Sequence, residues 1–243
     1  MIGVAVVTGG EGGIGRAINR RLIAAGYTVI SGDITVRRDG EGWADRDPKS
    51  RLYRQNLDVT DAGSAERTAA VAAELGSLTA LVNCAGILRG ADLDGFDEQS
   101  IKSMLDINLL GAARMTNAAV AHMQPGAAIV NISSISGRLN DVSHIALYGG
   151  SKAALEAYTR TTGAALARRG IRMNAVAPGF IDVDMTPDMR RAAETPGSPA
   201  ARIPLGRFGS ADEVAECVEF LLSPRASYVA GATLIIDGGL TGR

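Results

Sequence analysis

Cysteine and histidine are scarce in this sequence, and their scarcity excludes two classes of protein. The chain has two residues of each type among 243. Cys84 and Cys217 lie at unrelated places, so the sequence predicts neither a disulfide framework nor a metal site. We therefore expect no bound metal. Because unpaired cysteines are typical of a reducing compartment, we also expect a cytoplasmic location.

The chain also lacks an excess of charge of one sign and any long apolar run. Its 25 Lys and Arg residues are scattered and balanced by 26 Asp and Glu residues, for a formal net charge of −1. This balance provides no electrostatic footprint for nucleic acid. No apolar run approaches the ~20 residues that span a bilayer. Residues 1–7 lack a basic flank and are predicted to form a strand rather than a signal peptide. We expect neither nucleic acid nor membrane as a partner.

What the chain does have is a regular alternation of strand-like and helix-like segments, with no linker or internal repeat. Its length suits one large α/β domain, residues 1–243, with a well-buried core. Strands are predicted at residues 2–7, 28–32, 52–56, 79–83, 128–132 and 172–176. Helices are predicted at residues 16–25, 61–75, 97–122 and 147–169. Such alternation predicts a parallel sheet with helices on both faces.

A glycine-rich turn follows the first predicted strand and leads into the first predicted helix. It reads Thr8-Gly9-Gly10-Glu11-Gly12-Gly13-Ile14-Gly15 and fits both G-x-G-x-x-G and T-G-x-x-x-G-x-G. Glycines in this context let the backbone approach a pyrophosphate, and the helix N-terminus supplies amide donors and a favourable dipole. The alternative is a flexible turn without a ligand. We predict a Rossmann-type doubly wound fold that binds a dinucleotide. The turn residues assigned to the cofactor are Gly9, Glu11, Gly12, Gly13, Ile14 and Gly15.

The second predicted strand is followed by Asp33, about 20 residues beyond the glycine turn. An acidic side chain at this place can bind both ribose hydroxyls of NAD, whereas it repels the 2′-phosphate of NADP. Glu11 adds a second unfavourable charge for that phosphate. Arg37 and Arg38 offer an alternative phosphate site, although they also suit a solvated loop. The sequence predicts NAD as the cofactor.

Tyr148 and Lys152 are four residues apart in Tyr148-Gly149-Gly150-Ser151-Lys152. On a helix this spacing places both side chains on one face. An ammonium ~4 Å from the phenol is worth ~4 kcal/mol at an effective dielectric near 20, which could lower the tyrosine pKa by roughly three units. That change would suit general acid–base catalysis. The alternative is an ordinary amphipathic helix with a solvated lysine.

Several further segments complete a pattern. They are Asp58-Val59, Asn83-Cys84-Ala85-Gly86, Asp106-Ile107-Asn108-Leu109-Leu110-Gly111, Asn131-Ile132-Ser133-Ser134, Pro178-Gly179-Phe180-Ile181, Leu205-Gly206-Arg207-Phe208-Gly209 and Asp237-Gly238-Gly239. In this order and spacing, and together with the two motifs above, they resemble the short-chain dehydrogenase/reductase family along essentially the whole chain. The chain is most similar to the subgroup that includes 3-oxoacyl carrier-protein reductases and small-alcohol dehydrogenases.

The resemblance implies a catalytic tetrad and the rest of the cofactor site. Tyr148 is the implied general acid–base, and Ser134 binds the substrate oxygen. Lys152 lowers the tyrosine pKa and holds the nicotinamide ribose, while Asn108 orders a water that relays the proton. The implied cofactor-binding residues beyond the glycine turn are Asp33, Asp58, Val59, Asn83, Ala85, Gly86, Tyr148, Lys152, Pro178, Gly179 and Ile181.

The chain departs from the family pattern next to the implied cofactor. Cys84 stands where the family has a second asparagine, and a small buried thiol can pack there. Val183 stands where many relatives place a threonine that holds the nicotinamide carboxamide, so Thr186 or backbone must supply that contact. Residues 181–204, which are rich in proline and glycine, are predicted to form a substrate lid; an idle loop is the alternative.

The spacing around the implied catalytic serine also departs from the pattern. Ser134 lies one residue farther from Tyr148 than is usual in the subgroup, which indicates an insertion within residues 138–147. Ser133 and Ser136 are the alternative catalytic serines.

A few other residues have both a possible functional role and a purely structural explanation. Arg89 and Arg138 follow segments that border the predicted pocket and could pair with a substrate carboxylate; solvent exposure is the alternative. His144 precedes Tyr148 and faces either the substrate or a surface loop. Trp43 is interpreted as a surface or subunit contact.

The two long predicted helices carry more small and apolar residues than one sheet-facing stripe needs. These are Ala112, Ala113, Met115, Ala118, Ala119, Ala153, Ala154, Leu155, Ala157, Ala164 and Ala165. Surplus apolar area implies a second packing partner, and relatives pair the equivalent helices. We expect a homotetramer, or at least a dimer. The alternative is that alanine simply suits long helices.

Three functions are compatible with these residues. The first is an NAD-dependent dehydrogenase that transfers a hydride between NAD and a small-molecule secondary alcohol or ketone. The second is an NADPH-dependent 3-oxoacyl thioester reductase. The third is a non-catalytic NAD-binding sensor or scaffold, which the loss of tetrad residues would favour; all four are present.

Overall fold

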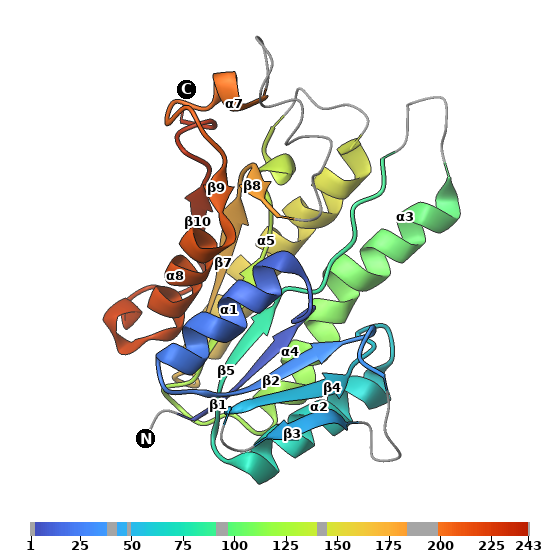
Figure 1. The fold of residues 1–243 in the computed structure, drawn as a ribbon, viewed down its shortest axis with the longest axis vertical. Helices are drawn as coiled ribbons and strands as arrows, with labels where there is room; N and C mark the ends of the chain where they lie inside the picture. Colours follow the sequence, from blue (N-terminus) through green and yellow to red (C-terminus); the bar gives the residue numbers. More distant parts are fainter. Residues whose placement is uncertain are drawn as a thin grey trace.

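A computed structural model describes residues 3–37, 43–47, 50–90, 97–139, 145–183 and 199–242, with only the backbone of 43–47. Its main sheet has eight strands in the order β10-β7-β6-β5-β1-β2-β4-β3 (Figure 1). The strands of this sheet are β1 (Val4–Thr8), β2 (Thr28–Asp33), β3 (Trp43–Asp47), β4 (Leu52–Asn56), β5 (Leu78–Asn83), β6 (Ala128–Ile132), β7 (Arg172–Pro178) and β10 (Thr233–Ile236). A second, two-stranded sheet pairs β8 (Ile181–Asp182) with β9 (Gly209–Ser210).

The α-helices are α1 (Gly13–Ala24), α2 (Ala62–Leu75), α3 (Glu98–Leu105), α4 (Ala112–Val120), α5 (Ala146–Ala167), α7 (Pro199–Arg202) and α8 (Ala211–Leu222). A π-helix (Asp106–Gly111) and 3-10 helices at Ile135–Gly137 and Pro224–Ala226 complete the described elements. The predicted strands and helices are all present. The elements α8 and β10 were not predicted from periodicity.

The doubly wound parallel sheet is confirmed. β1 pairs in parallel with β2 on one side and with β5 on the other, so the strand order reverses beside the glycine turn. β3 is the exception, because it pairs with β4 in the antiparallel direction at the edge of the sheet. The sequence indicated a charged loop there. An edge strand needs pairing on one side only and tolerates charge, which is why its apolar pattern is weak.

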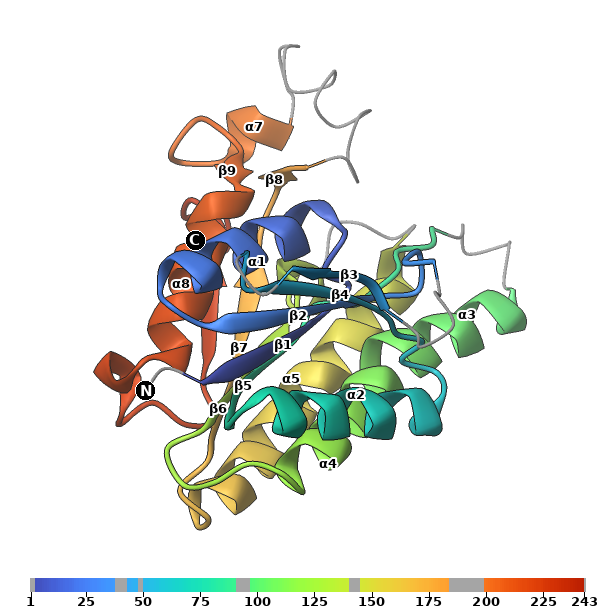
Figure 2. The ribbon, with the colours of Figure 1, turned by 60° about the horizontal axis from the view of Figure 1, so that its bottom comes forward.

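Helices cover both faces of the sheet, and each face has its own core (Figure 2). α1 and α8 lie on one face, where Leu22 and Val218 pack against Ala5 and Val7 of β1. α2, α4 and α5 lie on the other face, where residues such as Met115 join the alternate side chains of β1. Because successive side chains of a strand point to opposite faces, a strand covered on both faces must be apolar throughout. All five residues of β1 are buried.

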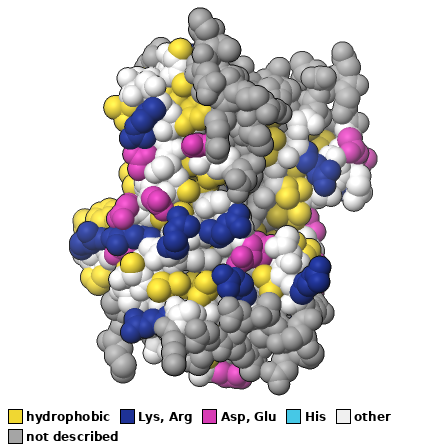
Figure 3. Space-filling view, viewed as in Figure 1, with side chains coloured by type: hydrophobic (Ala, Val, Ile, Leu, Met, Phe, Trp, Pro, Cys, Tyr) yellow, Lys and Arg dark blue, Asp and Glu magenta, His cyan; other side chains and the backbone are white. Residues whose placement is uncertain are grey.

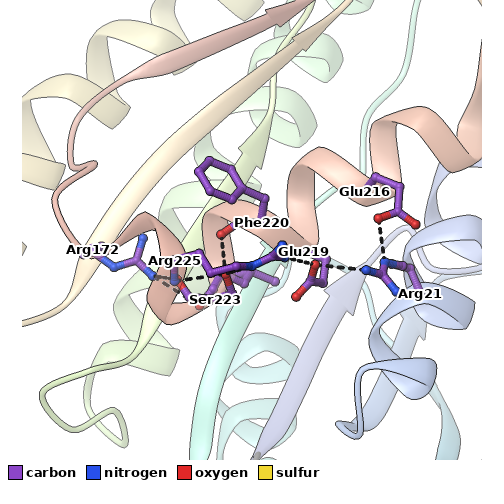
Figure 4. A network of polar contacts seen from close by, with 8 residues as sticks. Arg21, Arg172, Glu216, Glu219, Phe220, Ser223 and Arg225 are labelled. Atoms are coloured by element: carbon purple, nitrogen blue, oxygen red, sulfur yellow. Dashed lines mark hydrogen bonds and ion pairs between the residues drawn. The ribbon is translucent and has the colours of Figure 1, made fainter.

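Ion pairs fix α8 to α1 at the surface (Figure 4). Arg21 of α1 contacts Glu216 at 3.0 Å and Glu219 at 3.1 Å. Glu219 also pairs with Arg225 at 2.5 Å. Arg172 donates to three carbonyl groups at the C-terminal end of α8, where a cation is favourable to the helix dipole. This network holds the helix layer that covers β1.

The long helix predicted at residues 97–122 is interrupted by the π-helix. Its start is as expected, because the Asp97 side chain accepts a 3.1 Å hydrogen bond from the Gln99 amide. The interruption occurs where the helix passes close to the loop after β4. A Cβ atom on Gly111 would lie 2.7 Å from Val59 Cγ2, so only glycine permits this approach. π-turns inside α-helices occur frequently at functional sites.

The surface carries mixed charge. On the face shown in Figure 3, Lys and Arg side chains lie among Asp and Glu side chains. Within the described ranges, no helix is long and apolar enough to cross a membrane. Among the same residues, no group of three or more His, Cys, Asp and Glu side chains could hold a metal ion.

Candidate active site

The glycine turn connects β1 to α1 at the carboxyl edge of the sheet. Gly9 has a φ of 63°, and a Cβ atom on it would lie 2.7 Å from Ala85 Cα. A Cβ atom on Gly15 would lie 2.2 Å from the Gly9 carbonyl oxygen. Gly12 caps α1 without a side-chain hydrogen bond, so the amide groups of the first turn are left to a ligand. The turn therefore fits a pyrophosphate group.

Asp33, which is predicted to bind a ribose, ends β2 beside the glycine turn. Asp33 accepts hydrogen bonds from the Glu11 amide at 3.2 Å and from the Thr35 amide at 3.0 Å. Its carboxylate is thus fixed beside the glycine turn. Arg37 is exposed and Arg38 lies outside the described residues.

The other cofactor residues predicted from the family pattern lie at the carboxyl ends of neighbouring strands. Asp58 and Val59 follow β4, and the Asp58 carboxylate accepts a 2.9 Å hydrogen bond from the Thr60 amide. Asn83 ends β5 and leads to Ala85 and Gly86, and the Ala85 amide donates to Thr8 Oγ1 at 3.0 Å. Pro178 ends β7, Gly179 packs on the Asp237 backbone, and Ile181 begins β8. In an open α/β sheet this edge is where ligands bind.

Ser134 caps the N-terminus of the 3-10 helix (Ile135–Gly137) that follows β6. The Ser134 Oγ accepts a 3.1 Å hydrogen bond from the Ser136 amide and donates to Ser136 Oγ at 3.2 Å. Ser133 points elsewhere, because its Oγ donates to Glu156 Oε1 at 3.0 Å. Of the three candidate serines, Ser134 is the one whose side chain affects the pKa of Tyr148.

Tyr148 and Lys152 lie one turn apart on α5. The Lys152 Nζ is 5.8 Å from the centroid of the Tyr148 ring and donates a 2.8 Å hydrogen bond to the Ile132 carbonyl. The structure does not give the expected lowering of the tyrosine pKa by Lys152. Burial raises the pKa of Tyr148, and the hydrogen bond with Ser134 opposes this rise. Burial also lowers the pKa of Lys152 to about 8. Removal of both groups from water is the reason for the difference.

Asn108 lies within the π-helix and connects it to α5. Its Oδ1 accepts from the Ile87 amide at 2.8 Å, and its Nδ2 donates to the Ile87 carbonyl at 2.9 Å. The Nδ2 also donates to Ser151 Oγ at 3.0 Å, and Ser151 donates to the Tyr148 carbonyl at 2.7 Å. The side chain of Asn108 is thereby locked close to the tyrosine.

Apolar side chains border the tetrad. Ile87, Met104 and Ile145 pack with Tyr148. The cluster beside Ser134 consists of Ile135, Leu139, Phe180, Ile203, Phe208 and Leu240. The rings of Phe180 and Phe208 stack with their centroids 5.7 Å apart. Among the described residues, the surroundings of Tyr148 and Ser134 are therefore largely apolar.

Arg138 is paired with Glu156. Its Nη2 is 2.6 Å from Glu156 Oε2, and its Nε donates to the same oxygen at 3.0 Å. The Nε and Nη2 of Arg138 are thus engaged by this buried carboxylate. Arg89 is exposed, and His144 lies outside the described residues.

Part of the predicted lid lies outside the described residues as well. Val183 is buried, whereas Thr186 and the rest of 184–198 are not described. Cys84 packs against the core beneath the turn. Burial raises the pKa of its thiol to about 12, so it is protonated at neutral pH.

Sequence reasoning missed the residues that hold the predicted ones in place. Glu156 lies four residues beyond Lys152, and this repeat of the Tyr148 to Lys152 spacing on one helix face was an available signal. Ser31 and Arg54, which contact Glu11, carried no comparable signal, because their contact depends on the pairing of β2 with β4.

Comparison with known proteins agrees with this arrangement. A family model described as enoyl-(acyl carrier protein) reductase matches residues 9–241. Cis-4-hydroxycyclohexanecarboxylate dehydrogenase of Sinomonas cyclohexanicum is 40% identical over 98% of this chain and 96% of its own length. The 3-oxoacyl-(acyl-carrier-protein) reductase FabG of Thermotoga maritima is 38% identical over 98% of this chain and 97% of its own.

A solved structure gives the same assignment. A short-chain dehydrogenase from Burkholderia cenocepacia in complex with NADP is 30% identical, with a TM-score of 0.83 over 97% of this chain and 96% of that one. The chain belongs to the short-chain dehydrogenase/reductase family. It is an oxidoreductase with a nicotinamide cofactor that acts on hydroxyl or keto groups.

Proposed function

We propose that this protein is an NAD-dependent dehydrogenase that interconverts a small secondary alcohol and its ketone. The observation that carries the proposal is the placement of Tyr148 one turn before the buried Lys152 on α5, with the Lys152 Nζ 5.8 Å from the centroid of the tyrosine ring. A serine, a phenol and an ammonium meet there at the carboxyl edge of the sheet. The glycine turn that fits a pyrophosphate lies at the same edge.

The proposed chemistry divides among the four residues. The phenolate form of Tyr148 takes the proton from the substrate hydroxyl, and in ketone reduction its hydroxyl returns that proton. Ser134 donates a hydrogen bond to the substrate oxygen as charge develops there. Lys152 holds a ribose of the cofactor, while Asn108 keeps the π-helix and α5 in register. A bound nicotinamide would supply the hydride acceptor.

The preference for NAD is supported by Asp33. Its carboxylate is fixed by two backbone amides where a ribose would lie, and a second negative group from a 2′-phosphate would be repelled. Solved relatives that are 31% and 30% identical are complexes with NADPH and with NADP, so the proposed preference for NAD rests on the residues of this chain. The negative charge of Asp33 is therefore the basis for proposing NAD rather than NADP.

A second candidate is an NADPH-dependent 3-oxoacyl thioester reductase. The names of the Thermotoga maritima relative and of a (3R)-3-hydroxyacyl-CoA dehydrogenase from Rattus norvegicus, 36% identical, favour it. A non-catalytic sensor is disfavoured, because the groups of the tetrad are all present. Kinetic constants with NAD and NADP, measured on a panel of cyclic secondary alcohols, ketones and 3-oxoacyl thioesters, distinguish the candidates. Higher kcat/KM for thioesters with NADPH would overturn the proposal.

The direct test of the chemistry is Tyr148→Phe. This variant keeps the aromatic ring but removes the hydroxyl, so turnover should fall at least ~100-fold, the low end for a lost acid–base group. Binding of NAD, followed by titration calorimetry, should stay within about twofold, because the ring and Lys152 are retained. Near-native turnover would remove Tyr148 from its proposed role.

We also propose a homotetramer in the cytoplasm. Several of the helix residues that suggested a partner, Met115 and Leu155 among them, are buried within this chain. Exposed Leu105, Leu110 and Leu147 now support the proposal, since α3, the π-helix and α5 present them to solvent at 38%, 47% and 39% exposure. A cytoplasmic location is supported by the two free cysteines.

A further inference from the structure

Glu11 lies beside Asp33 and is held from two strands. Its backbone amide donates to Asp33 Oδ2 at 3.2 Å. Its side-chain Oε1 accepts a 2.7 Å hydrogen bond from Ser31 Oγ and lies 3.3 Å from Arg54 Nε. The carboxylate is therefore fixed over the ends of β2 and β4, on the same side of the sheet edge as Asp33.

The groups beneath Glu11 are themselves ordered. Ser31 and Arg54 are register partners in the pairing of β2 with β4. The buried Asn19 amide donates to Ser31 Oγ at 3.0 Å and to the Gly10 carbonyl at 3.0 Å. A Cβ atom on Gly10 would lie 2.3 Å from Ser31 Oγ, so glycine is what lets the turn approach the strand. The position of the Glu11 charge is built into the fold.

We propose that Glu11 is a second specificity-determining residue at the ribose end of the cofactor site. Asp33 provides hydrogen-bond acceptors for ribose hydroxyls, whereas Glu11 acts by charge. Its carboxylate, which is held by Ser31 and Arg54, repels a 2′-phosphate. The Glu11 side chain is 24% exposed, so solvent screens its charge only in part. The inference rests on the proposed preference for NAD and deepens it.

The test compares Glu11→Gln with native protein in titration calorimetry with NAD and with NADP. Glutamine keeps the shape and can still accept the bond from Ser31, so only the charge is removed. The dissociation constant for NADP should fall about tenfold, which corresponds to about 1.4 kcal/mol, while that for NAD should change less than about twofold. The gain should shrink in 1 M salt, because the Debye length falls to about 3 Å.

Two control variants test whether the effect is specific to Glu11. Glu74→Gln removes an exposed carboxylate from α2 and should leave both dissociation constants unchanged. Asp33→Asn should tighten NADP and weaken NAD, because it also removes an acceptor for the ribose.

The outcomes separate this inference from the proposed function. Native protein that binds NADP more tightly than NAD would overturn both. Native protein that prefers NAD, with an unchanged ratio of dissociation constants in both Glu11→Gln and Glu11→Ala, would overturn the role of Glu11 alone. A fall in the dissociation constant for NADP in both variants supports the proposed role of Glu11.

Discussion

The ammonium group of Lys152 is a buried charge. The residue is 4% exposed, and its Nζ donates to the Ile132 carbonyl. Burial lowers its pKa from 10.5 to about 8, so the unfolded chain holds this proton more tightly than the folded one. The penalty for burying the charge is therefore present in full below pH 8. It is relieved as the pH rises from 8 toward 10.5.

We expect Lys152→Met to be more stable than the native chain at pH 7 although it is inactive. One pKa unit corresponds to ~1.4 kcal/mol, so the gain in the free energy of unfolding should reach about 3 kcal/mol. The gain should disappear as the pH rises through the window from 8 to 10.5. Urea unfolding of both proteins at a series of pH values measures it. A difference that stays constant across that window would show that the charge is not the cause.

The junction between β6 and α5, which is held by contacts among Ser133, Arg138 and Glu156, positions Ser134. Ser133 and Arg138 both contact the Glu156 carboxylate, one from each end of the 3-10 helix. Ser134 lies between them and therefore depends on the same contact. The side chain of Glu156 is 8% exposed and that of Arg138 is 41% exposed, so the pair is partly screened by water.

Glu156→Gln should loosen this junction. We expect a loss of about 1–2 kcal/mol in stability, less than for a fully buried pair because Arg138 is partly solvated. Turnover should fall about tenfold with the KM for NAD unchanged, since a small displacement of Ser134 misaligns the substrate oxygen. Chemical denaturation and steady-state kinetics measure the two effects.

The matched control is Glu98→Gln, which breaks an exposed ion pair with Lys102. It should change stability by less than about 0.5 kcal/mol and leave turnover alone. Equal effects of Glu156→Gln and Glu98→Gln on turnover would contradict the role of Glu156 in positioning Ser134.

The elements predicted from local pattern are present, although α8 was missed despite the local signal of its Ser210 and Glu213 capping box. The strands at 52–56 and 128–132 agree with β4 and β6 residue for residue. The π-helix was not predictable, because it depends on the contact of Gly111 with Val59 across the fold. Among site residues, Tyr148 and Lys152 could be predicted from their spacing. The raised pKa of Tyr148 could not be predicted, because spacing indicates the nearby charge but not the burial of the phenol.

At the scale of the whole molecule, the exposed leucines predict assembly. Light scattering at micromolar concentration should report a tetramer, or at least a dimer, for the native chain. Leu110→Glu should shift the distribution toward smaller species, because a buried unpaired carboxylate opposes association. Leu75→Glu, at a comparably exposed site at the end of α2 (39% against 47%), should leave the mass unchanged. A monomeric native chain would contradict the proposed assembly.

The strand order also bears on how the chain folds during synthesis. β1 to β5 pair only with one another until β6 is made, so residues 4–83 can form five of the eight strands of the sheet early. Each later strand of this sheet then adds beside the one made before it: β6 on β5, β7 on β6 and β10 on β7. At ~5–20 residues per second, the remaining 160 residues take roughly ten to thirty seconds to emerge. The part that carries the glycine turn and Asp33 can thus form before the part that carries Ser134 and Tyr148 has left the ribosome.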